Sequence, residues 1–294
     1  MDKTNELAIF EAGISEPEEM RNLQNIIKPN IGIFTNIGQA HDENFINQKQ
    51  KIGEKLKLFT HVDTLIFSSD QKDIHEIIIK SEILKKVDSF IWGKQEDSDL
   101  MITQIQKEAQ QSIINARYRG NNISITIPFA DDASIENAIH CWSLMLLMNY
   151  ENSIIANRML SLTPIAMRLE LKEGTNNCII INDSYNSDFN SLSIAIDFLK
   201  QQSNTEVSGR KTVVILSDIL QSRKNDVELY TAVAKLIDDK NINRFIGIGS
   251  NISRQADKFD DDAIFYKNTN EFLTNFSFSS FANQIVLLKG ARVF

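Results

Sequence analysis

The sequence has few of the features that define secreted, membrane-bound or metal-stapled proteins. It contains only two cysteines in 294 residues, too few for a disulfide framework or a four-cysteine zinc site. No stretch reaches the roughly 18 apolar residues that a membrane span needs. The first residues do not place a basic segment before an apolar one, as a secretory signal would. We therefore expect a cytoplasmic protein without a membrane partner.

Clustered positive charge is also missing. The net charge is −8, and no group of lysines is interleaved with aromatic residues, which argues against nucleic acid as a partner. No GxxxxGK[ST] segment occurs, so these residues carry no phosphate-cradling P-loop. Phosphorylated small molecules remain candidate ligands, because backbone amides, a metal ion and a few cations can hold them locally.

The chain does contain short apolar runs that alternate with amphipathic stretches. An apolar share of 42% and a charged share of 24% are ordinary for a globular protein, and the length suits about two domains. The apolar runs predict strands at residues 7–10, 31–35, 64–67, 90–92, 178–183, 212–218, 244–249 and 284–290. The amphipathic or apolar stretches predict helices near residues 15–28, 48–59, 74–84, 135–148, 189–202 and 225–239.

This order predicts two α/β domains. Residues 1–163 are expected to form a domain with a mostly parallel sheet, to which residues 101–129 add an antiparallel meander. Pro164 lies between a helix and a new strand, and we place the boundary there. Residues 164–294 are expected to form a second, Rossmann-like α/β domain with a mostly parallel sheet.

One loop is unusually polar. Residues 35–45, TNIGQAHDENF, follow the strand IGIFT directly, at the carboxyl end where open α/β sheets bind ligands. His41 stands there among oxygen-bearing side chains such as Asn36. The loop is either a solvated turn or one wall of a site for metal and phosphate. Glu11, after the strand expected at residues 7–10, is likewise either a solvated loop residue or a carboxylate at a strand end. The other three histidines are expected to have structural roles: His61, His75 and His140.

Five segments in order resemble the Mur ligase family, the ATP-dependent ligases that build the peptide of bacterial peptidoglycan. FEAGISEPEEM resembles the family's strand-end glutamate and Ser-x-Pro-Glu helix start, and KPNIGIFTNIGQAHDENF resembles its loop-histidine block. INDSYNSDFNSLSIAIDFL resembles the Asp-Ser-Tyr-Asn block of the branch that adds D-alanyl-D-alanine. RKTVVILSDIL and IVLLKGAR resemble two strands of the C-terminal domain. The resemblance runs through nearly the whole chain.

The resemblance implies a central ATPase domain followed by the family's C-terminal domain, with ATP and Mg²⁺ as cofactors. It implies UDP-N-acetylmuramoyl-tripeptide and D-alanyl-D-alanine as substrates, joined through an acyl phosphate. By position, Glu11, His41 and Lys55 would hold magnesium. Lys55 lies fourteen residues after the histidine and would act as a carbamate. Its neighbours Lys51 and Lys57 are expected in solvent.

The resemblance also implies a nucleotide site. Asn137 matches the residue that contacts adenine, Arg168 the arginine that reaches the phosphates, and Asp183 the acid that contacts the ribose. Asn36 is expected beside the nucleotide, and His41, Lys55 and Arg168 are the expected catalytic residues. Tyr185 and Asn186 belong to the same block as Asp183 but receive no individual role.

The family's N-terminal UDP-sugar domain and P-loop have no counterpart in these residues. We therefore expect a ligase fragment with an incomplete central domain, inactive by itself. A non-catalytic module that docks to a partner is one alternative. A second alternative is another amide ligase of the same superfamily. The Asp-Asn-Pro-Arg motif is missing, which argues against the diaminopimelate- or lysine-adding branch. In some bacterial lineages an alanine racemase domain follows, and no segment here shows one.

Overall fold

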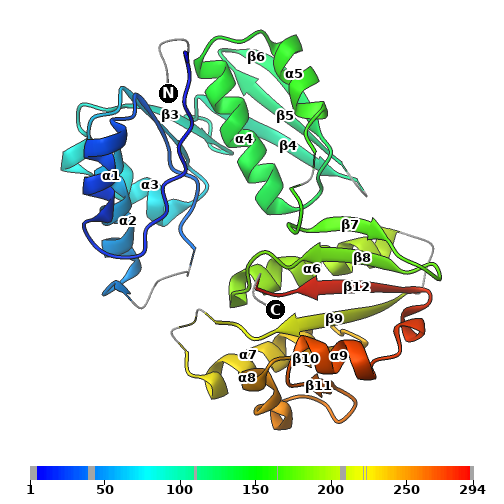
Figure 1. Ribbon diagram of the computed structural model, residues 1–294. Helices are drawn as coiled ribbons and strands as arrows, with labels where there is room; N and C mark the ends of the chain where they lie inside the picture. The colour runs from blue at the N-terminus through cyan, green and yellow to red at the C-terminus, as the bar shows by residue number, and fades with distance from the viewer. Residues whose placement is uncertain are drawn as a thin grey trace.

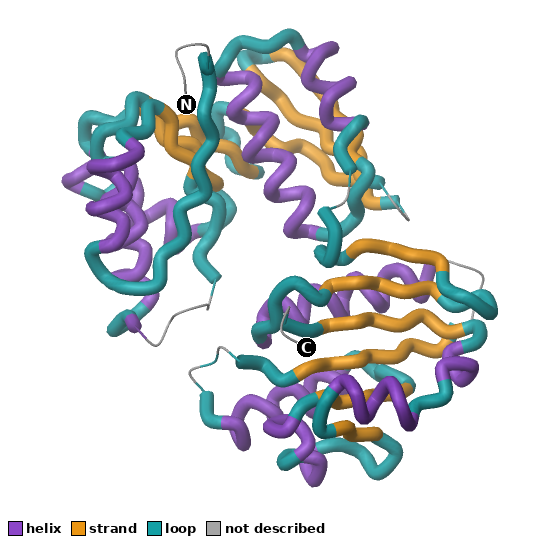
Figure 2. Tube along the Cα trace, viewed as in Figure 1, coloured by secondary structure: helices purple, strands orange, loops and turns teal. Residues whose placement is uncertain are grey.

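The computed structural model describes residues 5–38, 44–108, 111–163, 165–205, 210–220, 222 and 224–291. Its strands form two six-stranded sheets, one in each half of the chain (Figure 1). Helices lie against both sheets, as Figure 2 shows. Strands are neighbours in the order β1-β2-β3-β4-β5-β6 in the first sheet and β11-β10-β9-β12-β8-β7 in the second.

The first half matches the predicted order of helices and strands closely. Its elements are α1 (Glu19–Ile27), β1 (Ile31–Ile33), α2 (Gln48–Leu56), η2 (Lys57–Phe59), β2 (Thr64–Ser68), α3 (Lys72–Ile79), η3 (Glu82–Leu84), β3 (Asp88–Gly93), β4 (Leu100–Lys107), β5 (Ser112–Tyr118), β6 (Asn121–Ile127), α4 (Asp132–Leu147) and α5 (Asn152–Leu160). Strands β1 to β4 pair in parallel, and β4 to β6 pair antiparallel, which confirms the predicted meander.

Strand β2 shows how this sheet divides two cores. Successive side chains of a strand point to opposite faces. Leu65 and Phe67 pack in the cluster formed with α1, α2 and α3, whereas Ile66 packs in the cluster formed with α4. The strand therefore reads as a continuous apolar run, as expected of a parallel strand that is covered on both faces.

The strand predicted at residues 7–10 is not formed. The chain there pairs with no described strand, and Leu7, Ile9 and Phe10 are 59%, 83% and 55% exposed. An apolar run becomes a strand only where a neighbouring strand offers free backbone groups and a face to cover it. In the described ranges, the only strand paired with β1 is β2.

The second half contains β7 (Glu170–Glu173), β8 (Ile179–Asp183), α6 (Phe189–Thr205), β9 (Lys211–Ser217), α7 (Asp226–Asp239), β10 (Arg244–Ile248), α8 (Ser250–Ser253), η4 (Ala256–Lys258), β11 (Ile264–Tyr266), α9 (Thr269–Asn275), η5 (Phe278–Phe281) and β12 (Gln284–Lys289). Only the pair β7–β8 is antiparallel, so the mostly parallel second sheet is confirmed. Helices α6 and α7 pack on one face of this sheet, and α9 with η5 packs on the other.

The two halves meet near the start of α4. Ala130, just before this helix, packs in the same buried cluster as Ile181 and Leu192 of the second half. The two sheets lie on either side of residue 164 in the sequence. Pro164 itself lies outside the described residues, and the division into domains at this point stays a prediction. None of the helices that the structure describes has the length and apolar character to span a membrane.

Candidate active site

The polar segment after β1 begins at the carboxyl edge of the first sheet. Phe34 still belongs to the sheet, because its N–H donates to the Ile66 carbonyl oxygen at 2.9 Å and its side chain is buried. Thr35 and Asn36 follow and are exposed. The predicted ligand His41 lies outside the described residues. The segment therefore leaves the sheet where ligands bind in open α/β proteins.

Lys55 extends from α2 to this segment. Its ammonium donates to the Asn36 carbonyl oxygen at 3.2 Å and lies 5.7 Å from the centre of the Phe34 ring. A small cavity of about 50 Å³ is lined in part by Lys55, Phe34, Asn36 and Ala12. Burial, and to a smaller extent the neighbouring Lys51 ammonium, lowers the pKa of Lys55. The amine is therefore neutral more often than that of a solvated lysine, which favours reaction with electrophiles.

The expectation that Lys51 lies in solvent is wrong, and Lys57, expected in solvent, is partly exposed but held in ion pairs. Lys51 is only 3% exposed, and its ammonium donates to the Gly38 carbonyl oxygen at 2.8 Å. Lys57 forms ion pairs with Glu54, at 2.7 Å, and with Glu18. Both lysines have partners because two other segments pack against this part of the chain. The segment after β1 contributes the Gly38 carbonyl oxygen, and the turn before α1 contributes the Glu18 carboxylate. Sequence spacing along a short helix does not reveal such covering.

The predicted magnesium ligands stay a prediction. Glu11 is exposed in the extended segment before α1, and its neighbour Ala12 lines the same cavity as Lys55. Within the described ranges, no three His, Cys, Asp or Glu side chains lie close enough to hold a metal ion. Magnesium prefers hard oxygen ligands, so Lys55 fits the ion only as a carbamate, whose oxygens resemble a carboxylate. The lowered pKa of Lys55 is consistent with that modification.

Helix α4 begins close to the same edge of the first sheet. Asp131 caps the helix, and its carboxylate accepts a hydrogen bond from the Ser134 N–H at 2.8 Å. Gln71, after β2, donates from Nε2 to the Thr35 carbonyl oxygen at 3.3 Å and also contacts the Glu136 carboxylate. Burial raises the pKa of Glu136. Asn137, the predicted adenine contact, is the next residue and is exposed.

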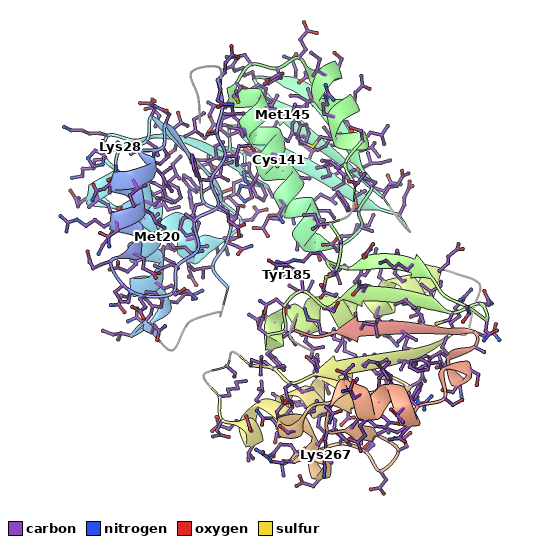
Figure 3. All side chains as sticks on the ribbon, in the orientation of Figure 1. Met20, Lys28, Cys141, Met145, Tyr185 and Lys267 are labelled. Atoms are coloured by element: carbon purple, nitrogen blue, oxygen red, sulfur yellow. The ribbon has the colours of Figure 1, made fainter. Side chains whose placement is uncertain are left out.

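Arg168 and Tyr185 form a contact at the junction of the two halves. The Arg168 guanidinium lies 4.3 Å from the centre of the Tyr185 ring, a cation–π distance. The Tyr185 N–H donates to the Met167 carbonyl oxygen at 3.3 Å. Figure 3 shows Tyr185 between the first half and the second sheet. The predicted phosphate-binding arginine is therefore exposed at this junction.

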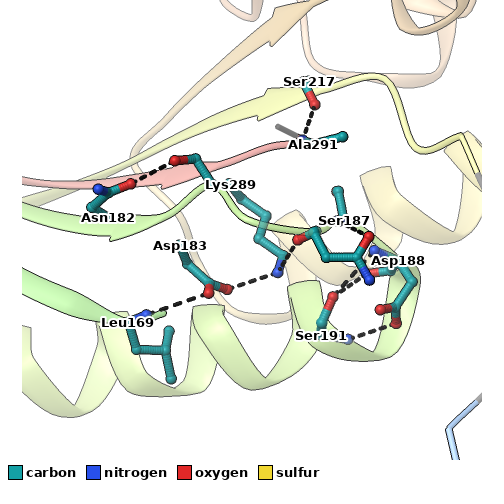
Figure 4. Close-up of polar contacts among 11 residues, drawn as sticks. Leu169, Asn182, Asp183, Ser187, Asp188, Ser191, Ser217, Lys289 and Ala291 are labelled. Atoms are coloured by element: carbon teal, nitrogen blue, oxygen red, sulfur yellow. Dashed lines mark hydrogen bonds and ion pairs between the residues drawn. The ribbon is translucent and has the colours of Figure 1, made fainter. Parts of the chain in front are cut away.

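Asp183 ends β8 and is 7% exposed. One carboxylate oxygen pairs with the Lys289 ammonium at 2.7 Å, and the other accepts a hydrogen bond from the Leu169 N–H at 3.3 Å (Figure 4). Both oxygens already have partners within the protein. The predicted ribose contact is untested, and the structure shows in addition a structural function for this carboxylate.

These side chains form two groups, one at each sheet. At the first sheet, Asn36 and Lys55 are in direct contact, and Gln71 links the end of β1 to Glu136, next to Asn137. At the second sheet, Asp183 and Arg168 are joined through the backbone of residues 167–169. Two mostly parallel sheets with polar side chains at their carboxyl ends define an α/β protein, a class in which ligands generally bind at strand ends.

Comparisons with known proteins identify the family. Residues 1–145 match the Mur ligase middle domain. The chain is 25% identical to UDP-N-acetylmuramoyl-tripeptide–D-alanyl-D-alanine ligase of Buchnera aphidicola subsp. Baizongia pistaciae, over 99% of this chain and 62% of the relative. It is 24% identical to the Rickettsia prowazekii enzyme of the same name, over 99% of this chain and 65% of the relative. The chain belongs to the Mur ligase family.

Solved structures show the same fold. A crystal structure of MurF from Acinetobacter baumannii matches with a TM-score of 0.83 at 19% identity, over 100% of this chain and 63% of that one. MurF ligase from Thermotoga maritima in complex with ADP matches with a TM-score of 0.73 at 14% identity, over 95% and 62%. The chain thus spans a little under two thirds of the length of these relatives. The predicted family resemblance is confirmed.

Proposed function

We propose that the chain is part of an ATP-dependent amide ligase that adds D-alanyl-D-alanine to UDP-N-acetylmuramoyl-tripeptide in peptidoglycan synthesis. The observation that carries this proposal is the position of Lys55, a half-buried amine on α2 that donates to the Asn36 carbonyl oxygen just after β1. The curated relatives that match 99% of the chain bear the name of that reaction. ATP is the proposed nucleotide, because one relative of known structure holds ADP.

The proposed metal is Mg²⁺, held by Glu11, His41 and the carbamate of Lys55. The ion would supply positive charge next to the phosphoryl oxygens. Carbamylation joins the neutral amine to carbon dioxide and releases a proton, so burial of Lys55 favours it. The Asn36 carbonyl oxygen, which the Lys55 ammonium contacts, orients this side chain toward the end of β1.

The nucleotide would contact both groups of side chains. Asn137 binds adenine, Asn36 lies beside the phosphates, and Arg168 reaches the phosphates from the junction. Asp183 is the proposed ribose contact. Each carboxylate oxygen has two lone pairs, so a ribose hydroxyl could share an oxygen that already accepts a bond from Lys289 or Leu169. Closing the two groups around one nucleotide would exclude water from the reacting phosphate.

The proposed reaction has two steps. The substrate carboxylate takes the terminal phosphoryl group of ATP, which gives an acyl phosphate and ADP. The amine of D-alanyl-D-alanine then attacks the acyl carbon, which forms the amide bond and releases phosphate and a proton. His41, Lys55 and Arg168 are the proposed catalytic residues, because positioning and charge stabilisation provide most of the catalysis of phosphoryl transfer.

We also propose that the 294 residues alone do not turn over ATP. The sequence contains no GxxxxGK[ST] segment to hold the phosphates in place. A non-catalytic docking module is the alternative that this feature favours. The ligase and the docking module differ in one testable respect. Only a ligase would gain activity when a GxxxxGK[ST] segment is added.

The test is phosphate release from ATP by a ligase that contains these 294 residues together with a GxxxxGK[ST] segment. We expect release that depends on both UDP-N-acetylmuramoyl-tripeptide and D-alanyl-D-alanine. Release that depends on diaminopimelate or lysine instead would assign the chain to another branch. No substrate-dependent release at all, from a folded protein, would favour the docking module.

A further inference from the structure

Lys289 places a charged group inside the second half of the protein. It is the last residue of β12, between β8 and β9, and its side chain is 2% exposed. The ammonium lies 2.7 Å from Asp183 Oδ2 and donates to the Asn186 carbonyl oxygen at 2.8 Å. A buried charge is costly unless it is paired and hydrogen-bonded. This ammonium satisfies both conditions through one short block, residues 183–186.

The partner carboxylate extends the contact to the connection between the two sheets. Asp183 Oδ1 accepts a hydrogen bond from the Leu169 N–H at 3.3 Å, as Figure 4 shows. The same connection accepts a bond from the block, because the Tyr185 N–H donates to the Met167 carbonyl oxygen at 3.3 Å. Lys289 therefore contacts both ends of residues 183–186. This block in turn binds residues 167–169 through two hydrogen bonds, one from its side-chain carboxylate and one from its backbone.

Residues 167–169 have a conformation that needs such support. Met167 has a φ of 63° and Leu169 a φ of 47°, and both are non-glycine residues in the left-handed region. A non-glycine residue in this region is strained and persists only where surrounding contacts determine its conformation. Arg168 lies between them, and its guanidinium rests 4.3 Å from the Tyr185 ring centre. The direction of Arg168 thus depends on the two residues that flank it.

We propose that Lys289 is a positioning residue for Arg168. By pairing with Asp183 and holding the Asn186 carbonyl oxygen, it fixes residues 183–186, which keep Met167 and Leu169 left-handed and present Arg168 at the junction. The ligand that Arg168 then meets, a nucleotide phosphate, rests on the function proposed above. The positioning itself does not depend on that function.

Hydrogen exchange separates positioning from simple stabilisation. In the 294-residue chain, Lys289→Met keeps the length of the side chain and removes its charge. We expect the Leu169 and Tyr185 amides to exchange at least about tenfold faster, while the amide of Val214 in the buried strand β9 exchanges as before. Lys240→Met is the matched control, because it breaks a Lys–Asp pair, with Asp197, that is partly exposed. It should leave all three amides unchanged.

A double variant keeps the test valid if Lys289→Met fails to fold. Lys289→Met with Asp183→Asn leaves no unpaired buried charge. If the Lys289–Asp183 pair only stabilises the fold, the Leu169 and Tyr185 amides of this double variant should exchange at wild-type rates. Positioning by Lys289 predicts that both amides still exchange several-fold faster. Equal acceleration of every amide, Val214 included, or wild-type rates in the double variant, would overturn the inference.

Adding ADP distinguishes this inference from the proposed function. Arg168→Met and Lys289→Met should both weaken the saturation-transfer NMR signal of ADP, and Lys240→Met should preserve it. If exchange at Leu169 rises in Lys289→Met but ADP binds all the proteins equally, the positioning stands. The proposed contact between Arg168 and the nucleotide then fails.

Discussion

Trp92 and His140 form a buried hydrogen bond between β3 and α4. Trp92 Nε1 donates to His140 Nδ1 at 3.0 Å, and the rings meet edge to face with centres 4.9 Å apart. His140 is 2% exposed. Since Nδ1 accepts this bond, the imidazole is neutral with its proton on Nε2. Burial lowers the pKa of His140 to about 4. The pair joins the helix of Asn137 to the sheet.

The first prediction is that stability depends on pH through His140. The unfolded chain protonates this imidazole below about pH 6.5, whereas the folded protein keeps it neutral until about pH 4. The stabilisation is therefore complete above pH 6.5 and is lost as the pH falls toward 4, by up to about 3 kcal/mol. Urea unfolding of the wild type and of His140→Gln, at pH 7.5 and pH 5, measures the difference.

His61→Gln is the control for that measurement, because His61 is exposed. Its pH dependence should follow that of the wild type. If His140→Gln loses as much stability between pH 7.5 and pH 5 as the wild type does, the imidazole is not buried in its neutral form.

A second prediction contrasts two glycines. Gly249 has a φ of 143°, and a Cβ there would lie 2.3 Å from the carboxylate carbon of Asp218, which accepts the Ile252 N–H at 2.8 Å. Gly249→Ala should destabilise the protein by about 2 kcal/mol or more. Gly53 lies inside α2 with open space around its Cβ position, so Gly53→Ala should stabilise by about 0.5 kcal/mol or more. Thermal unfolding of both variants at one pH measures the two changes in melting temperature. Changes of the same sign would contradict the strained conformation of Gly249 or the helical position of Gly53.

A third prediction concerns His41, a proposed magnesium ligand. In a ligase that contains these residues and a P-loop segment, His41→Ala should reduce turnover by about tenfold or more and raise the magnesium concentration needed for half-maximal rate. His75→Ala is the comparison, because His75 lies on α3 with its ring 5.9 Å from the Phe67 ring. We expect it to change turnover little. Equal losses in both variants would show that the loop histidine has no special function.

Much of the fold could be predicted because its strands are apolar runs and its helices are amphipathic. β2, β8, β9, β10 and β12 all read this way. The failure at residues 7–10 has a physical reason, since the apolar run found no neighbouring strand within the described ranges. Sequence supplies the tendency to form a strand, and pairing decides the outcome.

The candidate site was less predictable. Motif positions led to Lys55, Asn137, Arg168 and Asp183. No local pattern pointed to the contact of Gln71 with Glu136, 65 positions away in the sequence. Nor did any pattern point to the pairing of Lys289 with Asp183, 106 positions away. The burial of Lys51 was missed for the same reason. Such contacts depend on how distant segments are brought together, which residue spacing does not record.

A fourth prediction is that the 294-residue chain alone releases no phosphate from ATP. The reason is the missing GxxxxGK[ST] segment, since catalysis of phosphoryl transfer depends on positioning. Phosphate release is measured with both proposed substrates and magnesium present. Substrate-dependent release well above that of a heat-treated sample would contradict the prediction.

The most direct test of the account is carboxylate rescue at Lys55. In a ligase that contains these residues and a P-loop segment, Lys55→Ala should lower turnover by about 100-fold, because the carbamate oxygens are lost. Lys49→Ala, an exposed position on the same helix, is the control and should keep full turnover. Added formate or acetate should restore part of the activity of Lys55→Ala and leave Lys49→Ala unchanged. Full turnover of Lys55→Ala, or a loss that no concentration of either carboxylate restores, would contradict the proposed site.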